Sequence, residues 1–167
     1  MIIILNGSCG VGKSTVAQVI ASKLERSVHI RGDDLRNLVF DAKINEEQNL
    51  LVDRNVLSLV RNYNKSNYCN IIIDNVYENK QHLETLTEEI RKIDPCIYVF
   101  RLYVSLEENI KRNAGRKKES IMEESRVREL YEVFRGQGDS VGKVIDSSKL
   151  SVDETAGLIL QRIKERL

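Results

Sequence analysis

The fold of this chain is decided by Gly7-Ser8-Cys9-Gly10-Val11-Gly12-Lys13-Ser14, a stretch with the spacing G-x-x-x-x-G-K-[ST]. Apolar residues come directly before it and predict a buried strand over residues 2–6. Apolar residues at helical spacing follow it and predict a helix over residues 13–25. Strand, loop and helix in this order are the context that a Walker A phosphate loop requires. The sequence therefore predicts a nucleotide-binding loop at the start of an α/β fold.

The residue types of this loop suit a triphosphate. Gly7, Gly10 and Gly12 permit backbone conformations and a close approach that a Cβ would block. The N-terminal end of the following helix adds positive partial charge. Lys13 is expected to reach the β- and γ-phosphates, and the Ser14 hydroxyl is expected to ligate Mg²⁺. The expected ATP-binding residues of the loop are Gly7, Ser8, Cys9, Gly10, Val11, Gly12, Lys13, Ser14 and Thr15.

The composition is that of a globular protein. Of the 167 residues, 41% are hydrophobic and 31% are charged, which fits one domain over residues 1–167. The formal net charge of +1 creates no overall field that would attract nucleic acid or a membrane surface. No apolar run approaches the length of a membrane span, and no basic stretch of a signal peptide precedes the loop. Cys9, Cys69 and Cys96 show neither metal-binding spacing nor an even disulfide framework, which favours a cytoplasmic protein.

Strands and helices alternate along the chain, and this alternation favours a parallel sheet covered by helices. Further strands are predicted at residues 27–31, 69–74, 96–104 and 143–146. Further helices are predicted at about 35–40, 46–62 and 83–93, from residue 105 into the basic segment, around residues 127–134, and over 151–167. Ser105-Leu106-Glu107-Glu108 and Ser151-Val152-Asp153-Glu154 have the spacing of capping boxes. Arg101 lies inside a predicted buried strand, where a charge is costly unless it is paired, and the pattern offers no account of it.

Polar side chains stand where the predicted strands end. In parallel α/β sheets, ligands bind beyond the carboxyl ends of the strands, so these side chains are expected beside the loop. The residues at these strand ends are Asp33, Asp34, Asp74, Ser147 and Ser148. Any one of them alone fits an ordinary turn, but several at one edge indicate a site.

Two of these positions carry acids suited to catalysis. One carboxylate of the Asp33-Asp34 pair would take the proton from a hydroxyl that attacks the γ-phosphate. The alternative for this pair is helix capping, which suits aspartate equally well. Asp74 ends an apolar strand as a Walker B acid does and would hold Mg²⁺, the alternative being an ordinary strand-end turn.

A basic segment lies one helix beyond the fourth strand. Arg112 and Arg116 are one helical turn apart in a stretch of Lys and Arg without an intervening acid. Two guanidinium groups at this spacing would close over a transferring phosphoryl group and neutralise its developing charge. The alternative is a solvated basic face, which charge runs usually form.

Together these motifs resemble the P-loop kinases that phosphorylate small or terminal hydroxyls. That group includes shikimate, gluconate and adenylylsulfate kinases, chloramphenicol phosphotransferase, zeta-type toxins and polynucleotide 5′-hydroxyl kinase. The resemblance spans nearly the whole chain. It implies a three-layer α/β fold with a five-stranded parallel sheet in the order 2-3-1-4-5, helices on both faces and a small mobile lid at about residues 112–120.

The resemblance also implies roles for individual residues. Arg31-Gly32-Asp33-Asp34-Leu35-Arg36 is similar to the D-D-x-R run of polynucleotide-kinase-like members, which implies Asp33 as the base and Arg36 on the substrate side. Arg112-Asn113-Ala114-Gly115-Arg116 resembles the R-x-x-x-R lid, and the stretch 144–151 resembles the loop near adenine in adenylylsulfate kinases. The implied catalytic residues are Lys13, Asp33, Arg112 and Arg116. The implied substrate-binding residues are Asp33, Asp34, Arg36 and Asp74, the metal ligands are Ser14 and Asp74, and Arg112, Ser147 and Ser148 join the ATP-binding set.

Some features depart from these families. The glycine triplet that shikimate kinases carry after strand three is missing, and Asp74-Asn75-Val76 stands there instead. With 5% aromatic residues and no Trp, no base-stacking platform for a polynucleotide is evident. An AAA-type motor would need a further helical domain, for which we expect no room. We therefore expect a phosphotransferase that moves the γ-phosphate of Mg-ATP to a small-molecule hydroxyl. A polynucleotide 5′-hydroxyl kinase and a non-catalytic nucleotide-binding protein stay as alternatives, and both a monomer and a homodimer stay open.

Overall fold

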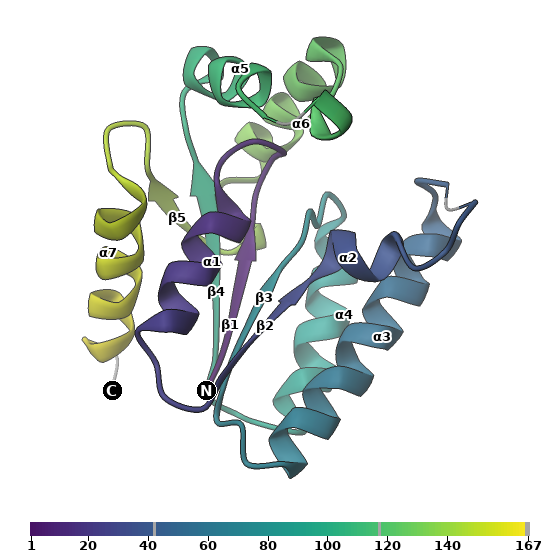
Figure 1. The fold of residues 1–167 in the computed structure, drawn as a ribbon, viewed down its shortest axis with the longest axis vertical. Helices are drawn as coiled ribbons and strands as arrows, with labels where there is room; N and C mark the ends of the chain where they lie inside the picture. The colour runs from purple at the N-terminus through teal and green to yellow at the C-terminus, as the bar shows by residue number, and fades with distance from the viewer. Residues whose placement is uncertain (42, 117, 166–167) are drawn as a thin grey trace.

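A computed structural model describes residues 1–41, 43–116 and 118–165 of the chain. Five parallel strands form one sheet in the order β2-β3-β1-β4-β5, which confirms the predicted topology (Figure 1). The strands are β1 (Ile2–Asn6), β2 (Ser27–Arg31), β3 (Asn70–Asp74), β4 (Ile97–Tyr103) and β5 (Lys143–Asp146). The central strand β1 and its neighbour β3 are continuous apolar runs, because helices cover both faces of the sheet.

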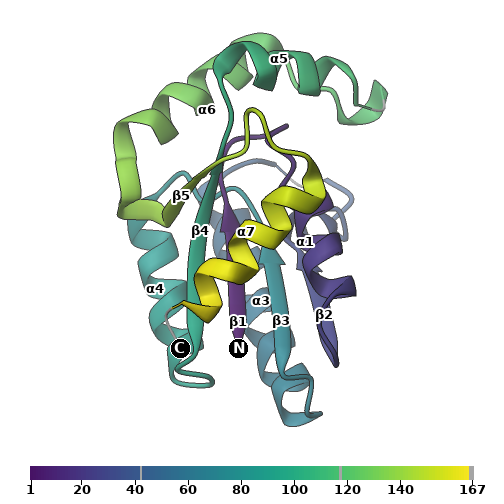
Figure 2. The same cartoon turned by 90° about the vertical axis from the view of Figure 1, so that its left-hand side faces the viewer.

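Helices cover the two faces of the sheet as two separate layers. The α-helices are α1 (Lys13–Ser22), α2 (Gly32–Arg36), α3 (Glu46–Lys65), α4 (Lys80–Arg91), α5 (Leu106–Ala114), α6 (Glu124–Gln137) and α7 (Val152–Lys164), and two 3₁₀ turns are η1 (Lys118–Ser120) and η2 (Gly138–Val141). Side chains alternate across β1, so that Ile3 packs toward α1 and α7 while Ile4 packs toward α3 and α4. Figure 2 shows α5 and α6 lying across the carboxyl end of the sheet. The residues at the strand ends therefore face the loop and these two helices.

Several predicted helices have different bounds in the structure, and the first two differ for visible reasons. The helix predicted at 35–40 is α2, which begins at Gly32 and ends at Arg36. Leu38 and Phe40 beyond it are exposed, so no core contact continues the helix there. The first helix ends at Ser22, three residues before its predicted end, and Arg26 then adopts a positive φ of 46°. Residues 166–167 of the predicted last helix lie outside the described residues.

The two predicted capping boxes differ in outcome. The Ser151 box is complete, since Ser151 and Glu154 each accept a hydrogen bond from the other's backbone N–H. At the start of α5, Ser105 accepts a hydrogen bond from the Glu108 N–H, but the Glu108 carboxylate accepts one from Arg112 Nε at 2.7 Å instead. The Ser105 box is therefore only half formed, because its acid, Glu108, binds an arginine of the predicted lid instead of the Ser105 N–H.

Arg101 is buried inside β4, only 4% exposed. Its Nε and Nη1 have no hydrogen-bond partner among the described residues. Burial lowers the pKa of this guanidinium, and the nearby Asp139 carboxylate opposes that shift. Among the described residues, Arg101 thus has one carboxylate neighbour but no close ion pair.

None of the described helices is long and apolar enough to cross a bilayer.

Candidate active site

Two adjoining cavities lie at the carboxyl edge of the sheet. One has a volume of about 590 Å³ and is lined by the loop, by the lid arginines and by the start of α7; we call it the loop cavity. The other has a volume of about 440 Å³ and is lined from α2, α3, α4 and α6; we call it the helix cavity. Cys9, Asp33, Asn75 and Val76 line both. The cavities therefore meet at a short boundary that includes one carboxylate.

The glycines of the loop adopt the conformations that the motif predicts. Gly7, Gly10 and Gly12 have φ values of 133°, 81° and 96°, in the region that favours glycine. A Cβ on Gly7 would lie 2.5 Å from the carbonyl oxygen of Leu102, which is backbone and cannot yield. The loop is thus shaped by close backbone contact with β4, and glycine is required there.

Lys13 closes the loop from inside. Its Nζ donates to the carbonyl oxygens of Gly7 and Ser8, both at 2.9 Å, and the side chain is buried. Burial lowers the pKa of Lys13, while the carboxylates of Asp74 and Asp33 oppose that shift. Gly7 and Ser8 form the inner side of the loop, and residues 9–15 line the loop cavity. The ammonium group therefore lies directly behind the surface where phosphates would bind.

A hydroxyl and a carboxylate meet next to the loop. Ser14 Oγ donates to Asp74 Oδ1 at 2.8 Å, and the other Asp74 oxygen contacts His29 Nε2. Asp74 is only 4% exposed, so its carboxylate is buried and fixed by these contacts and is not part of a solvated turn. The described residues contain no cluster of three or more His, Cys, Asp and Glu that could hold a metal by itself. The Ser14–Asp74 pair fits Mg²⁺, which prefers oxygen ligands and completes its shell with phosphates and water.

The contact between His29 and Asp74 has no signal in the sequence. The two residues lie on β2 and β3, which pair directly in the sheet. They are far apart in the chain, and only the strand order brings them together. A spacing pattern alone carries no signal for this contact.

The structure separates the two acids that follow β2. Asp33 lines both cavities, whereas Asp34 lines neither and pairs with Arg31 at 3.3 Å. Neither acid caps α2, because the N-cap position is Arg31 and no side chain makes the cap hydrogen bond. The capping alternative is therefore wrong. Asp33 alone is brought to the boundary of the cavities.

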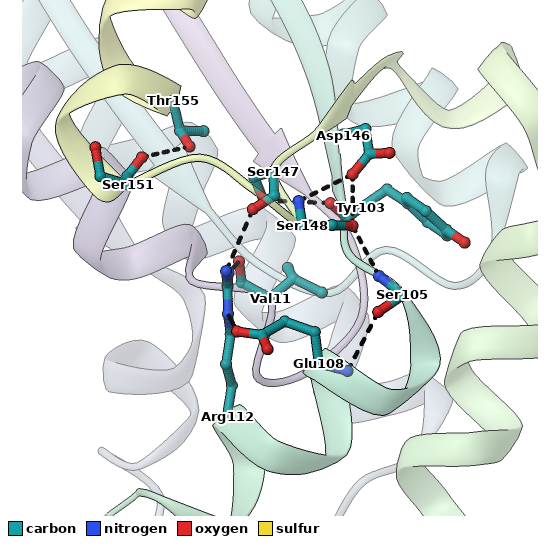
Figure 3. A network of polar contacts seen from close by, with 10 residues as sticks. All are labelled: Val11, Tyr103, Ser105, Glu108, Arg112, Asp146, Ser147, Ser148, Ser151 and Thr155. Carbon is teal, nitrogen blue, oxygen red and sulfur yellow. Dashed lines mark hydrogen bonds and ion pairs between the residues drawn. The ribbon is translucent and has the colours of Figure 1, made fainter.

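Arg112 and Arg116 both line the loop cavity. Arg112 donates to the carbonyl oxygens of Val11 at 3.4 Å and Ser147 at 3.2 Å, so it joins α5 to the loop and to the chain after β5 (Figure 3). Arg116 Nη1 donates to Cys9 Sγ at 2.7 Å. The two arginines are therefore not a solvated basic face. Residue 117 of the predicted lid lies outside the described residues.

The chain after β5 contributes one of its two predicted serines to the loop cavity. Ser147 is buried, lines the cavity, and donates to the carbonyl oxygen of Tyr103. Ser148 does not line the cavity, because its amide and hydroxyl both donate to Asp146 and its oxygen accepts from the Ser105 N–H (Figure 3). The structure thus brings Ser147, and not Ser148, to the site. Four lining residues nearby were not predicted, namely Leu150, Ser151, Val152 and Thr155.

Arg36 lies in the helix cavity with polar groups that the sequence did not single out. Its Nη2 donates to Asn49 Oδ1 at 2.9 Å, which ties α2 to α3. Asp53 lies one turn further along α3 and also lines this cavity. Asn49 and Asp53 belong to no motif, and only the approach of α3 to α2 gives them a place in the site.

Comparison with known proteins identifies a family and a shared fold. Residues 3–132 match a family model described as an AAA domain. No curated protein matches the sequence closely enough to be compared. Solved structures share the fold at low identity, and the fold is the one that the resemblance to small-molecule kinases implied.

Three of these structures illustrate the similarity. A tunicamycin resistance protein from Deinococcus radiodurans is 17% identical, with a TM-score of 0.74 over 97% of this chain and 94% of that chain. A sugar kinase from a Janibacter species is 15% identical, with a TM-score of 0.74 over 98% of this chain and 94% of that chain. A shikimate kinase from Acinetobacter baumannii is 17% identical, with a TM-score of 0.62 over 99% of this chain and 93% of that chain.

The family match covers the part of the chain that carries the site. It runs from β1 into α6 and includes the loop, Asp33, Asp74 and both lid arginines. An AAA-type motor has a further helical domain, which we did not expect in this chain. The family match concerns the P-loop domain alone. By this match over most of its length, the chain belongs to the family of AAA domains that the model describes.

Proposed function

We propose that this chain transfers the γ-phosphate of Mg-ATP to a hydroxyl group of a small molecule. The observation that carries the proposal is the position of Asp33 at the boundary between the loop cavity and the helix cavity. A nucleotide on the loop and an acceptor in the second cavity would meet at this carboxylate. The kinase folds of the similar structures support the same class of reaction.

Each residue of the site has its own role in the proposed reaction. Lys13 and the backbone N–H groups of the loop bind the phosphates, and Asp33 accepts the proton of the attacking hydroxyl. The hydroxyl oxygen forms a bond to the γ-phosphorus while the bond to the β-γ bridging oxygen breaks, leaving ADP. Mg²⁺ held by Ser14 and Asp74 would neutralise phosphate charge when bound. The acid–base step therefore rests on this chain's own carboxylate.

The arginines of α5 and the segment after it would act on the transferring group. Arg112 and Arg116 line the loop cavity and contact the loop at Val11 and Cys9, so their guanidinium groups would lie near the phosphates of a nucleotide bound there. Fixed positive charge at this position stabilises the charge that develops in the transition state. Closure of this segment would also exclude water, which otherwise hydrolyses ATP.

The proposal is tested by transfer of labelled γ-phosphate from ATP. A panel of small hydroxyl compounds and a set of 5′-hydroxyl oligonucleotides are incubated in parallel, with a Lys13→Ala variant as the control. Labelling of small molecules supports the proposal, whereas labelling of oligonucleotides alone would replace it with a polynucleotide kinase. Binding of ATP without any labelling would point to a non-catalytic nucleotide-binding protein.

Arg116→Ala is expected to lower kcat by about 10²–10³-fold, because a charge aimed at the transition state is lost. ATP binding should weaken much less, since the loop and Lys13 stay intact. Steady-state kinetics and ATP titration separate the two effects. Arg128→Ala is the matched control, because Arg128 is exposed on α6 and, among the described residues, pairs only with Glu124. A change in KM without a change in kcat would make Arg116 a ground-state binding residue.

A further inference from the structure

The charges on the wall of the helix cavity constrain what can bind there. If the proposed function is right, this cavity holds the acceptor, because it meets the loop cavity at Asp33. Among the described residues, its lining includes four carboxylates and two guanidinium groups. The carboxylates belong to Asp33, Glu46, Asp53 and Glu78, and the guanidinium groups to Arg36 and Arg126. Glu78 pairs with Arg126, and Glu46 lies 3.8 Å from His82, which also lines the cavity. The carboxylates of Asp33 and Asp53 then stand against the single guanidinium of Arg36, so an anionic acceptor would meet more negative than positive charge.

The two arginines do not offset this excess equally. Arg126 is already paired with Glu78 and with Glu129, so its charge is neutralised within the protein. Arg36 donates one amino group to Asn49, and its Nη1 is buried without a hydrogen-bond partner among the described residues. Arg36, which lines the cavity, thus carries one donor that the described residues leave unsatisfied. It is the single guanidinium of this lining without a carboxylate partner in the described part of the chain.

Asp53 is the carboxylate that the protein leaves most in need of a partner. It lies half-buried on α3 and receives no hydrogen bond from the described residues. Burial raises the pKa of Asp53 to about 6, a larger effect than the opposing charges of His82 and Arg36. The protein's own cations therefore do not compensate this carboxylate. A buried charge without a partner is costly and is retained where a ligand supplies the opposite charge.

We infer that the acceptor carries a protonated amine beside its hydroxyl, and that Asp53 binds this ammonium group. The inference rests on the proposed function and narrows it to an amino alcohol or amino sugar. An ammonium group supplies three donors and a positive charge to the Asp53 carboxylate. An oxygen of the same molecule accepts from Arg36 Nη1, while the reacting hydroxyl faces Asp33. A neutral polyol would leave Asp53 uncompensated, and a carboxylate or phosphate ester would be repelled.

The experiment compares acceptors that share a carbon skeleton and differ in charge. The probes are D-glucosamine, D-glucose and D-glucuronate, together with an amino cyclitol and amino alcohols beside their deaminated and carboxylated counterparts. Binding is measured by calorimetry in the presence of a non-hydrolysable ATP analogue, and transfer is measured with labelled ATP. We expect at least one aminated compound to bind about 10-fold or more tightly than its neutral counterpart. Tighter binding of neutral or carboxylated members, or no aminated binder, overturns the inference.

Variants of α3 assign the effect to Asp53. Asp53→Asn should lower affinity for the aminated compound by about 10–100-fold and leave affinity for the neutral counterpart within about 2-fold. Asp53→Glu keeps the charge and should preserve the preference. Glu47→Gln is the matched control, because Glu47 is exposed on the same helix outside the cavity. Equal losses for aminated and neutral compounds would show a merely structural role and overturn the assignment.

The two readouts keep the inference apart from the proposed function. Binding of an aminated compound through Asp53 without phosphoryl transfer contradicts the proposed function and leaves the ligand class standing. Phosphoryl transfer to a neutral or anionic compound at a rate that the Asp53 variants do not change would support the proposed function and contradict the ligand class. Each result therefore decides one of the two statements.

Asp53→Asn should also stabilise the free protein at pH 8. The folded-state pKa of Asp53, about 6, lies above the ordinary aspartate value of 3.8, so the charged form destabilises the fold at high pH. That cost is present above pH 6 and disappears as the pH falls toward 3.8. We expect a melting temperature about 2–4 °C higher for the variant at pH 8, and no difference near pH 4. His82, Arg36 and the buried Tyr77 hydroxyl are the groups facing Asp53 whose charge states also enter this comparison. A lower melting temperature at pH 8 would contradict this sign.

Discussion

Lys13→Ala is expected to abolish detectable phosphoryl transfer while the fold stays intact. The ammonium group is the buried cation behind the loop, and no other described lysine lines the loop cavity. Its loss removes the charge that neutralises the β- and γ-phosphates. The carbonyl oxygens of Gly7 and Ser8 also lose their donor, so the loop should bind ATP more weakly. Transfer of labelled phosphate, ATP titration and thermal unfolding measure these three effects separately.

The fold should survive this change for a physical reason. Burial already disfavours the charged form of Lys13, as the lowered pKa of this group shows, so removing it relieves a desolvation cost. Lys23→Ala is the matched control, because Lys23 follows the same helix, is exposed, and pairs with Asp153 alone in the part of the chain that the structure describes. Unchanged turnover in the Lys13 variant would refute the assignment of the loop as the phosphate site. A large loss in the Lys23 variant would show that the effect is not specific to the loop.

Asp33→Asn is expected to lower turnover by about 10²–10⁴-fold with little change in nucleotide affinity, because an amide cannot accept the proton of the hydroxyl. Asn keeps the size and shape of the side chain, so the boundary between the two cavities is preserved. Single-turnover transfer measures the chemical step, and titration with ATP measures binding.

The chain supplies its own control one residue away. Asp34 lies on the same short helix but pairs with Arg31 and lines neither cavity, so Asp34→Asn should change turnover by less than about 3-fold. A larger effect at Asp34 than at Asp33 would mean that the wrong carboxylate has been assigned. Equal effects at both would argue against a single base.

Most of the fold was predictable because its signals are local. The buried runs at residues 2–5 and 71–73 are continuous and apolar, as a strand covered on both faces requires. The complete capping box at Ser151 is likewise a four-residue pattern, and it marked the start of the last helix correctly. The predicted helix over residues 35–40 differs from α2 because Leu35 and Leu38 have helical spacing, but Leu38 and Phe40 are exposed and meet no core. Hydrophobic spacing shows which residues can pack, and not whether anything lies opposite them.

The candidate site likewise has parts that follow from local sequence patterns and parts that follow from long-range packing. The sequence by itself determined the phosphate loop, because glycine conformations and a lysine at fixed spacing are properties of one short segment. It also placed Asp33 and Asp74 at strand ends, where parallel strands bring their carboxyl ends to one edge. Tertiary structure alone decided that Asp33 and not Asp34 faces the cavities, that His29 contacts Asp74, and that Asp53 joins the helix cavity. These contacts depend on strand order and on how helices cross, which are long-range packing outcomes that no local spacing records.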